Sequence, residues 1–177
     1  YVHGNKRLVP LDSEWVANNK RFRYYNNWFT FGAGIQQNLS YDRKAGFTWG
    51  ADFNFHLKRQ YFQLGTEVSG KAFQSYQNYE FHLGYGMRYE DKDVQVAGFI
   101  GPSYSTGVGL VYDTAWTRKY YEPGIYTQFD VIKKVAPDVG LGASIYADWN
   151  REQTLAGLRL VLYFSSSYRG KKYYYTD

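Results

Sequence analysis

Residues 45–57, AGFTWGADFNFHL, alternate between two kinds of side chain along their whole length. The members that would share one face are Phe47, Trp49, Ala51, Phe53, Phe55 and Leu57. The members that would share the other face are Thr48, Gly50, Asp52, Asn54 and His56. A period of two predicts a β-strand, and this strand would have one apolar face and one polar face.

The same period of two returns along most of the chain. It is clear in residues 76–89 and 139–149 and weaker in 28–37, 61–70, 94–105, 121–133 and 154–164. Short polar turns at residues 58–60, 90–93 and around 136–138 would alternate with looser loops at 38–44, 70–75, 106–118 and 150–153. Tight turns at one rim and longer loops at the other are typical of an up-and-down barrel. We therefore predict an all-β protein with eight antiparallel strands.

The distribution of charge argues against a nucleic-acid partner. The chain has 177 residues and a formal net charge of +5, with 21 Lys and Arg against 16 Asp and Glu. The excess lies in the segments 1–26 and 165–177, whereas the stretch 27–164 is neutral. A groove for a phosphate backbone would place its cations on the folded body. The absence of cysteine also excludes disulfides and thiolate metal sites.

Eight antiparallel strands can close into two kinds of barrel. A soluble lipocalin-like barrel turns its apolar face inward around a ligand, whereas a membrane barrel turns that face toward lipid. The predicted strands reach the length of about 9–11 residues that crosses a tilted bilayer. Their polar faces are rich in Gly and in polar groups other than Lys. The aromatic residues expected in interfacial girdles near the strand ends are Trp28, Phe29, Tyr61, Phe62, Tyr89, Tyr121, Trp149, Tyr163 and Phe164. We therefore prefer the transmembrane barrel, with the lipocalin-like ligand-binding barrel as an alternative.

Four segments carry a resemblance to a known family. They are GFTWGADFNFHL (46–57), YEFHLGYGMRYE (79–90), VGLGASIYADW (139–149) and the closing GLRLVLYF (157–164). The chain resembles the small eight-stranded outer-membrane barrels of Gram-negative bacteria, the OmpA/OmpX type. It departs from them where thirteen residues follow Phe164. The resemblance implies an outer-membrane barrel over 27–164, with short periplasmic segments at 1–26 and 165–177.

Charged residues on the polar faces should meet inside the barrel, because eight strands leave an interior that side chains can fill. Glu67 and Glu80 flank the loop 70–75 and should lie close together, with Arg159, Arg88 or His82 as their cation. The expected polar network of the lumen consists of Asp52, Glu67, Glu80, His82, Arg88, Asp130, Asp148 and Arg159. The alternative for these residues is a carboxylate-lined ion path or cation site.

An enzyme that modifies lipid A is a further alternative, because some small outer-membrane barrels carry out such reactions. A hydrolase would need Ser, His and an acid within hydrogen-bond reach. The sequence does not show the His and Ser spacing of the deacylase family, since Lys58 follows His56 and Gly84 follows His82 at that distance. We expect no catalytic residues, no cofactor and no metal site.

The two ends of the chain and the long loops hold the candidate contacts with partners. Asp12 and Ser13 could cap a short helix over residues 13–21. The residues expected to bind an envelope protein partner are Trp15, Arg21, Arg23, Arg169, Lys171, Lys172, Tyr173 and Tyr174. The residues expected to contact lipopolysaccharide phosphates are Arg43, Lys44, Arg118 and Lys119. We expect a non-enzymatic structural or accessory subunit of a secretion, assembly, uptake or conjugation complex.

Overall fold

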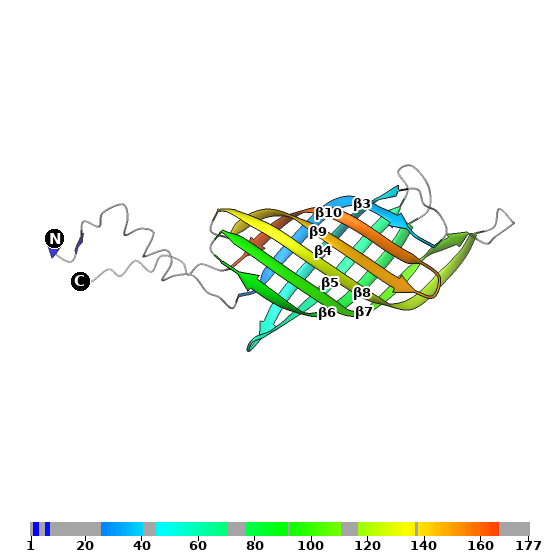
Figure 1. Cartoon of the computed structure of the whole chain (residues 1–177), viewed down its shortest axis with the longest axis horizontal. Coiled ribbons are helices and arrows are strands. Elements are labelled where there is room, and N and C mark those ends of the chain that lie inside the picture. The colour runs from blue at the N-terminus through cyan, green and yellow to red at the C-terminus, as the bar shows by residue number, and fades with distance from the viewer. Residues whose placement is uncertain are drawn as a thin grey trace.

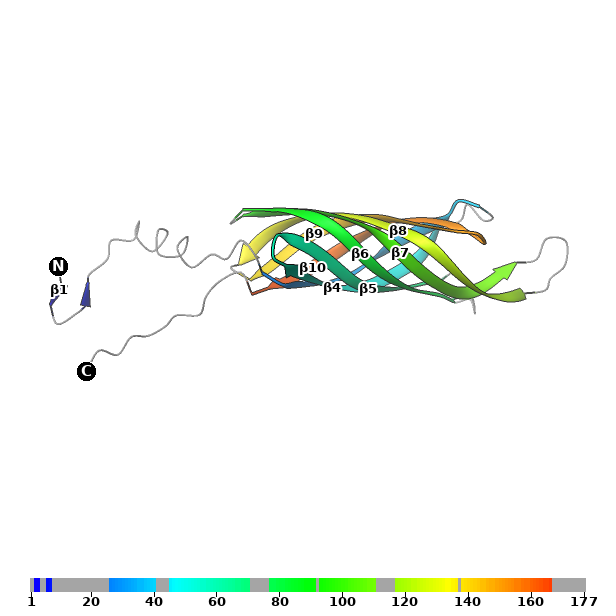
Figure 2. The same ribbon diagram turned by 90° about the horizontal axis from the view of Figure 1, so that it is seen from below.

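The structure is a computed structural model that describes residues 2–3, 6–7, 26–40, 45–70, 77–91, 93–110, 117–136 and 138–166. Ten β-strands are present in these residues. Two are short and pair with each other, β1 (Val2–His3) and β2 (Lys6–Arg7). The other eight form a closed barrel, which Figures 1 and 2 show as a long cylinder of tilted strands.

The barrel strands follow one another in chain order, and each pairs antiparallel with the next. They are β3 (Trp28–Asn38), β4 (Ala45–Leu57), β5 (Gln60–Gly70), β6 (Gln77–Glu90), β7 (Val94–Leu110), β8 (Thr117–Ala136), β9 (Val139–Asn150) and β10 (Thr154–Ser165). The last strand closes the barrel by pairing with the first, with Ser165 opposite Trp28. The eight-stranded antiparallel barrel expected from the sequence is thereby confirmed.

The two rims of the barrel differ. The rim that holds Trp28, Ser165 and the tight β4–β5, β6–β7 and β8–β9 connections is called the turn rim below. The opposite rim holds the β3–β4, β5–β6, β7–β8 and β9–β10 connections and is called the loop rim. Because the first and last barrel strands begin and end at the turn rim, the chain enters and leaves the barrel on one side.

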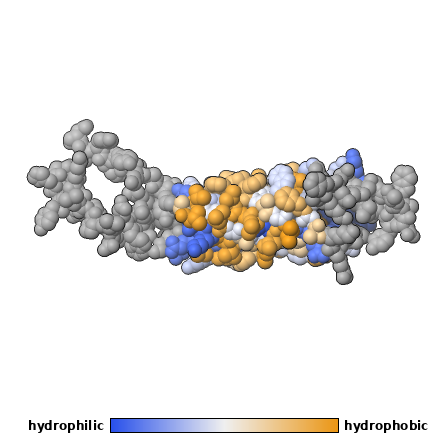
Figure 3. Space-filling model, turned by 90° about the horizontal axis from the view of Figure 1, so that it is seen from above, coloured by the Kyte–Doolittle hydropathy of each residue, from blue (hydrophilic) through white to orange (hydrophobic). Residues whose placement is uncertain are grey.

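The apolar face of each strand points outward. Phe47, Trp49 and Phe53 are exposed on β4, whereas Asp52 and Asn54, which flank Phe53, are buried inside the barrel. In Figure 3 the hydrophobic residues gather on the middle of the barrel, with hydrophilic residues toward its two ends. An apolar exterior around a polar interior is the arrangement of a membrane barrel and is opposite to that of a lipocalin. Among the described residues there is no helix long and apolar enough to span a membrane, a finding that says nothing about β-strands.

Three aromatic residues assigned to the outer girdles lie inside the barrel instead. Trp28, Tyr61 and Tyr163 are 2%, 6% and 0% exposed. Their neighbours Phe29 and Phe164 point outward, as expected. The prediction was wrong for these three because it weighed residue type above position, although successive side chains of a strand must point to opposite faces.

The loop expected at 106–118 is also shorter than predicted. β7 continues to Leu110 and β8 starts at Thr117, and the two strands stay paired as far as Leu110 opposite Thr117. β9 pairs with β8 only from Gly124 onward, opposite Asn150. The β7–β8 hairpin therefore extends as a ribbon beyond the neighbouring strand at the loop rim (Figure 1).

Candidate functional site

The lumen is filled by inward side chains that change in character along the barrel. Near the turn rim they form an apolar cluster of Trp28, Tyr61, Ala97, Phe99, Ile132, Val161 and Tyr163. Charged groups occupy the middle of the lumen, and neutral polar groups follow toward the loop rim. In that third region Gln153 donates to Asn78 at 3.2 Å and accepts from Asn38 at 3.0 Å. The filled interior is what the small diameter of an eight-stranded barrel predicts.

Arg159 on β10 is the central cation of the lumen. Its Nη2 lies 3.3 Å from Oδ2 of Asp52, 3.0 Å from Oε1 of Gln128 and 3.2 Å from the Tyr126 hydroxyl. Its Nη1 lies 3.7 Å from Oε2 of Glu67. The guanidinium therefore connects β10 with β4, β5 and β8. It compensates two buried carboxylates at once, as charges removed from water require.

His82 on β6 is the second base of this region. Its Nε2 lies 3.1 Å from Oδ1 of Asp52, and its Nδ1 lies 3.3 Å from Oε1 of Glu80. The imidazole also stacks on the Tyr126 ring, with 3.7 Å between centroids and an angle of 8°. Glu80 faces Glu67 directly across the β5–β6 pair. The two glutamates therefore lie together, with His82 beside one and Arg159 beside the other.

The remaining acidic residues predicted for the lumen are also buried there. Gln128 donates to Asp130 at 2.9 Å, and this amide is the link between Asp130 and the Arg159 guanidinium. Asp148 lies nearer the loop rim and accepts hydrogen bonds from Ser103 and, at 2.9 Å, from Ser105. Both carboxylates are thus joined to neutral donors.

Arg88 lies apart from the other predicted lumen residues, at the turn rim. Its guanidinium carbon lies 4.1 Å from the centroid of the Trp28 ring. It pairs with Glu90, which also pairs with Lys134. Arg88 further donates to the Tyr163 hydroxyl at 3.0 Å. These residues, called the rim cluster below, close the lumen on the side where the chain enters the barrel.

Comparison with solved structures identifies the fold. The barrel is similar to Neisserial surface protein A, with a TM-score of 0.63 and 12% identity over 78% of this chain and 96% of that chain. It is also similar to Ail, the attachment invasion locus protein of Yersinia pestis, with a TM-score of 0.56 and 11% identity over 81% of this chain and 99% of that one. The N-terminal β-barrel domain of OprF from Pseudomonas aeruginosa gives a TM-score of 0.55 and 10% identity over 79% and 98% of the two chains.

The fold is that of the small outer-membrane β-barrels. The chain is therefore an integral membrane barrel of the outer-membrane type, as its apolar exterior requires. No protein-family model matches the sequence, and no curated protein matches it. Ail has also been solved in complex with the heparin analogue sucrose octasulfate.

Several residues of this outer-membrane-type barrel that take part in the lumen were missed by the sequence analysis. They are Trp28, Tyr61, Glu90, Tyr126, Lys134 and Tyr163. The sequence signal for their inward orientation was the position of each residue in the alternation of inward and outward side chains along its strand. Tyr163, for example, lies four positions after Arg159 on the same strand and must therefore share its inward face. Tyr146 likewise points inward, and the Arg159 guanidinium carbon lies 4.9 Å from its ring centroid.

The predicted partner residues fall mostly outside the part of the chain that the structure describes. Those outside it are the helix expected over 13–21 together with Trp15, Arg21, Arg23, Arg43, Lys44, Arg169, Lys171, Lys172, Tyr173 and Tyr174. Arg118 belongs to β8, but its side chain is not described. Lys119, the next residue of β8, is exposed at the loop rim. Their contacts with partners and with lipopolysaccharide stay predictions.

The lumen of this barrel has the chemistry of a packed polar interior. Among the described residues, no group of three or more His, Asp and Glu side chains is placed to hold a metal ion. Each ring nitrogen of His82 faces a carboxylate, and Nη2 of Arg159 has three acceptors, whereas its Nε and Nη1 have no hydrogen-bond partner within the described part of the chain. Buried polar networks of this kind fix side chains in place when their members are paired. The arrangement is therefore suited to stabilising the barrel and blocking its lumen.

Proposed function

We propose that this barrel is a non-enzymatic structural or accessory subunit of the Gram-negative outer membrane that anchors part of a larger envelope complex. The complex would serve secretion, assembly, uptake or conjugation. The observation that carries the proposal is the network across the lumen, in which Arg159 joins β10 to Asp52 on β4 and Gln128 on β8. An interior occupied in this way supports an anchor better than a pore.

The geometry around His82 argues against a lipid A-modifying enzyme. A serine nucleophile needs a base with a free ring nitrogen, yet the two ring nitrogens of His82 face carboxylates, of Asp52 at 3.1 Å and of Glu80 at 3.3 Å. Ser103 lies opposite His82 on β7, but its hydroxyl donates to Asp148. The imidazole is also buried inside the barrel, away from the lipid-facing surface. These contacts favour a structural role for His82.

The turn rim is the part of the barrel at which the proposed envelope partner would bind. Trp28 and Ser165 pair there, so the segments before β3 and after β10 are attached to the same rim. We propose that this rim faces the periplasm and that the basic and aromatic residues of both segments bind the envelope partner. We propose that Arg43, Lys44, Arg118 and Lys119 contact lipopolysaccharide phosphates on the opposite side of the barrel.

Conductance measurements test the blocked lumen. The intact protein, reconstituted into planar lipid bilayers, should give no steady open channels. A variant with Arg159→Ala and Glu67→Ala, which removes side chains that fill the middle of the lumen, should give more frequent openings than the intact protein. Steady channels from the intact protein would contradict the anchor proposal and favour the ion path.

Affinity purification tests the partner. The intact chain, purified in mild detergent from Gram-negative cells that express it, should retain an envelope protein. A chain that ends after Ser166 keeps all barrel strands and should lose that protein, as should the variant Arg169→Gln/Lys171→Gln/Lys172→Gln. The matched control Lys58→Gln/Arg59→Gln/Lys133→Gln loses the same charge from the barrel and should retain it. Retention of nothing by the intact chain would overturn the accessory role.

A further inference from the structure

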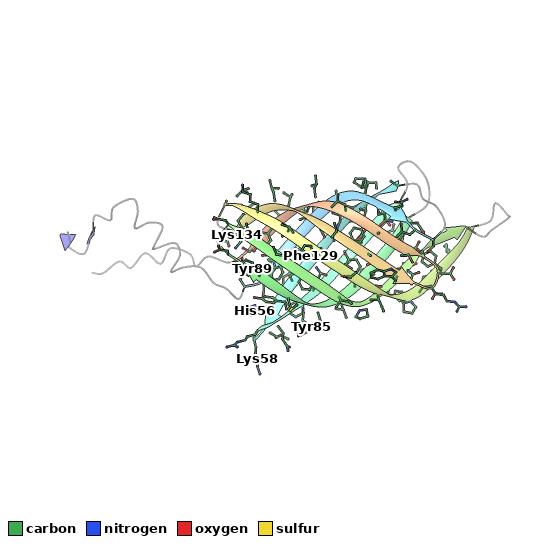
Figure 4. All side chains as sticks on the ribbon, viewed as in Figure 1. His56, Lys58, Tyr85, Tyr89, Phe129 and Lys134 are labelled. Carbon is green, nitrogen blue, oxygen red and sulfur yellow. The ribbon has the colours of Figure 1, made fainter. Side chains whose placement is uncertain are left out.

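The β4–β5 hairpin carries two cations at its tip. Lys58 and Arg59 form the turn between Leu57 and Gln60, which are the last pair of the hairpin. Pairing of β4 with β3 ends at Asn54, so the final residues of β4 extend past the first strand. Figures 1 and 4 show this tip projecting from the turn rim, with Lys58 at its end.

Both cations are exposed and available to a ligand. Within the part of the chain that the structure describes, neither Lys58 nor Arg59 takes part in an ion pair or side-chain hydrogen bond. Glu90, a carboxylate at the same rim, is already paired with Arg88 and Lys134. The hairpin tip is therefore a positively charged point without a protein counter-ion among these residues.

The backbone of the tip adds a second observation. Lys58 has a φ of 58°, in the left-handed region that glycine and asparagine adopt more readily. Among the described residues, Lys58 is the only residue other than glycine that has a positive φ. Lys58 thus occupies a turn position whose backbone conformation favours a smaller residue. We take this as an indication that the charge of Lys58 has a function.

A row of aromatic rings lies next to the tip on the outer face of the barrel. Phe55, Phe62 and Tyr85 are direct cross-strand partners on β4, β5 and β6. Their ring centroids are 5.7 Å apart for Phe55 and Phe62 and 5.6 Å apart for Phe62 and Tyr85. Phe53 continues the row, stacked on Phe55 at 6.0 Å. The row faces lipid, because these positions belong to the outward side of their strands.

The two cations and the adjacent aromatic row are complementary to the two parts of an anionic lipid, its charged headgroup and its apolar chains. Lys and Arg side chains at the ends of membrane segments extend toward the lipid headgroups, and aromatic residues are enriched at the same interface. Phosphate oxygens accept charge-assisted hydrogen bonds from both cations, and Arg can offer two at once. Acyl chains or glycerol groups can lie against the rings.

We propose that the β4–β5 hairpin is a binding site for an anionic phospholipid. The phosphate contacts Lys58 and Arg59, and the apolar part of the lipid lies along Phe55, Phe62 and Tyr85. The site requires the turn rim to face a phospholipid leaflet and is independent of any partner complex. Zwitterionic phospholipids occupy the same surface with lower affinity, because their positive headgroup opposes the two cations.

Native mass spectrometry of the full chain in mild detergent tests the proposal. Titration with phosphatidylglycerol should show tighter binding than titration with phosphatidylcholine. The variant Lys58→Gln/Arg59→Gln should lose about thirtyfold of that preference, since each Lys or Arg near an anionic surface contributes about fivefold. The matched control Lys133→Gln/Arg151→Gln removes the same charge from β8 and from the β9–β10 connection, away from the hairpin, and should keep the preference.

Additional measurements separate the contribution of the aromatic rings from that of the cations and distinguish phospholipid from lipid A as the source of the phosphate. The variant Phe55→Leu/Phe62→Leu should weaken both phospholipids to a similar degree, because it removes rings and no charge. Heat-dependent gel mobility shows whether each variant is folded. Equal binding of the two phospholipids by the intact chain, or an unchanged preference in Lys58→Gln/Arg59→Gln, overturns the proposal. So does tighter binding of lipid A than of phosphatidylglycerol that depends on these two cations.

Discussion

Arg159 and Asp52 form an ion pair that passes over the inner face of the first barrel strand. Nη2 of Arg159 on β10 lies 3.3 Å from Oδ2 of Asp52 on β4, although β3 separates the two strands. β3 presents Gly32 and Gly34 to this part of the lumen, so no side chain obstructs the guanidinium. On β4, a Cβ at position 50 would come within 1.9 Å of Nη1 of Arg159. Glycines on two strands thus make room for the contact that secures the closing strand.

Loss of the Arg159 cation should strongly destabilise the barrel. We expect Arg159→Met to lower the free energy of unfolding by about 3–5 kcal/mol, because Glu67 would stay buried without the guanidinium and Asp52 would keep only His82 as a basic partner. Urea unfolding in lipid vesicles, followed by heat-dependent gel mobility, measures this change. The control Lys133→Met replaces an exposed cation of β8 and should change stability by less than about 0.5 kcal/mol. Equal stability of both variants would show that the lumen network contributes little.

A methyl group at position 65 should disturb the same network from β5. A Cβ there would lie 2.1 Å from Nε2 of His82 and 2.3 Å from Oδ1 of Asp52. Both side chains are fixed by other contacts, so we expect Gly65→Ala to cost about 1–3 kcal/mol. Gly98→Ala is the matched control, because its nearest atom would be 3.7 Å away on the outer face. The same unfolding assay should show a lower midpoint for Gly65→Ala alone.

Most strands of the barrel could be predicted from the sequence, but few of the side-chain contacts in its lumen could. Alternation predicted the strand at 45–57 with the bounds that β4 has, because one face of a membrane strand meets lipid and the other meets polar groups. The closeness of Glu67 and Glu80 followed from the hairpin that joins their strands. The contact of Arg159 with Asp52 could not be predicted, since it depends on barrel closure and on the glycines of an intervening strand.

The errors also have physical reasons. Trp28 and Tyr163 were placed in the outer girdles because aromatic rings favour a membrane interface, although an interior beside a cation suits them as well. The Gly-rich end of β7 hid its continuation to Leu110, because glycines weaken the alternation on which the prediction relied. Arg88 could be assigned to the lumen from its parity, but not to the rim cluster, which brings together side chains of β3, β6, β8 and β10.

The rim cluster should restrict access to the lumen from the turn rim. We expect Arg88→Ala to lose the contact with Trp28 and to leave Glu90 with Lys134 as its cation. Unfolding should become easier by about 1–3 kcal/mol, because a cation–π contact and several charged hydrogen bonds are lost together. Fluorescence quenching of Trp28 by iodide, in a background with the other tryptophans replaced by phenylalanine, should increase. Arg59→Ala, at the exposed hairpin tip, should leave the quenching unchanged.

The turn at the hairpin tip should become more stable with glycine at position 58. Lys58 has a φ of 58°, and a left-handed conformation costs an L-residue about 1–2 kcal/mol that glycine avoids, less the greater chain entropy that glycine loses on folding. We therefore expect Lys58→Gly to raise the free energy of unfolding by about 0.5–1 kcal/mol. Arg59→Gly is the control, because Arg59 has no positive φ and the substitution removes the same charge. A higher urea midpoint for Lys58→Gly than for Arg59→Gly would show that lysine is kept at this position in spite of backbone strain, whereas equal midpoints would refute the strain.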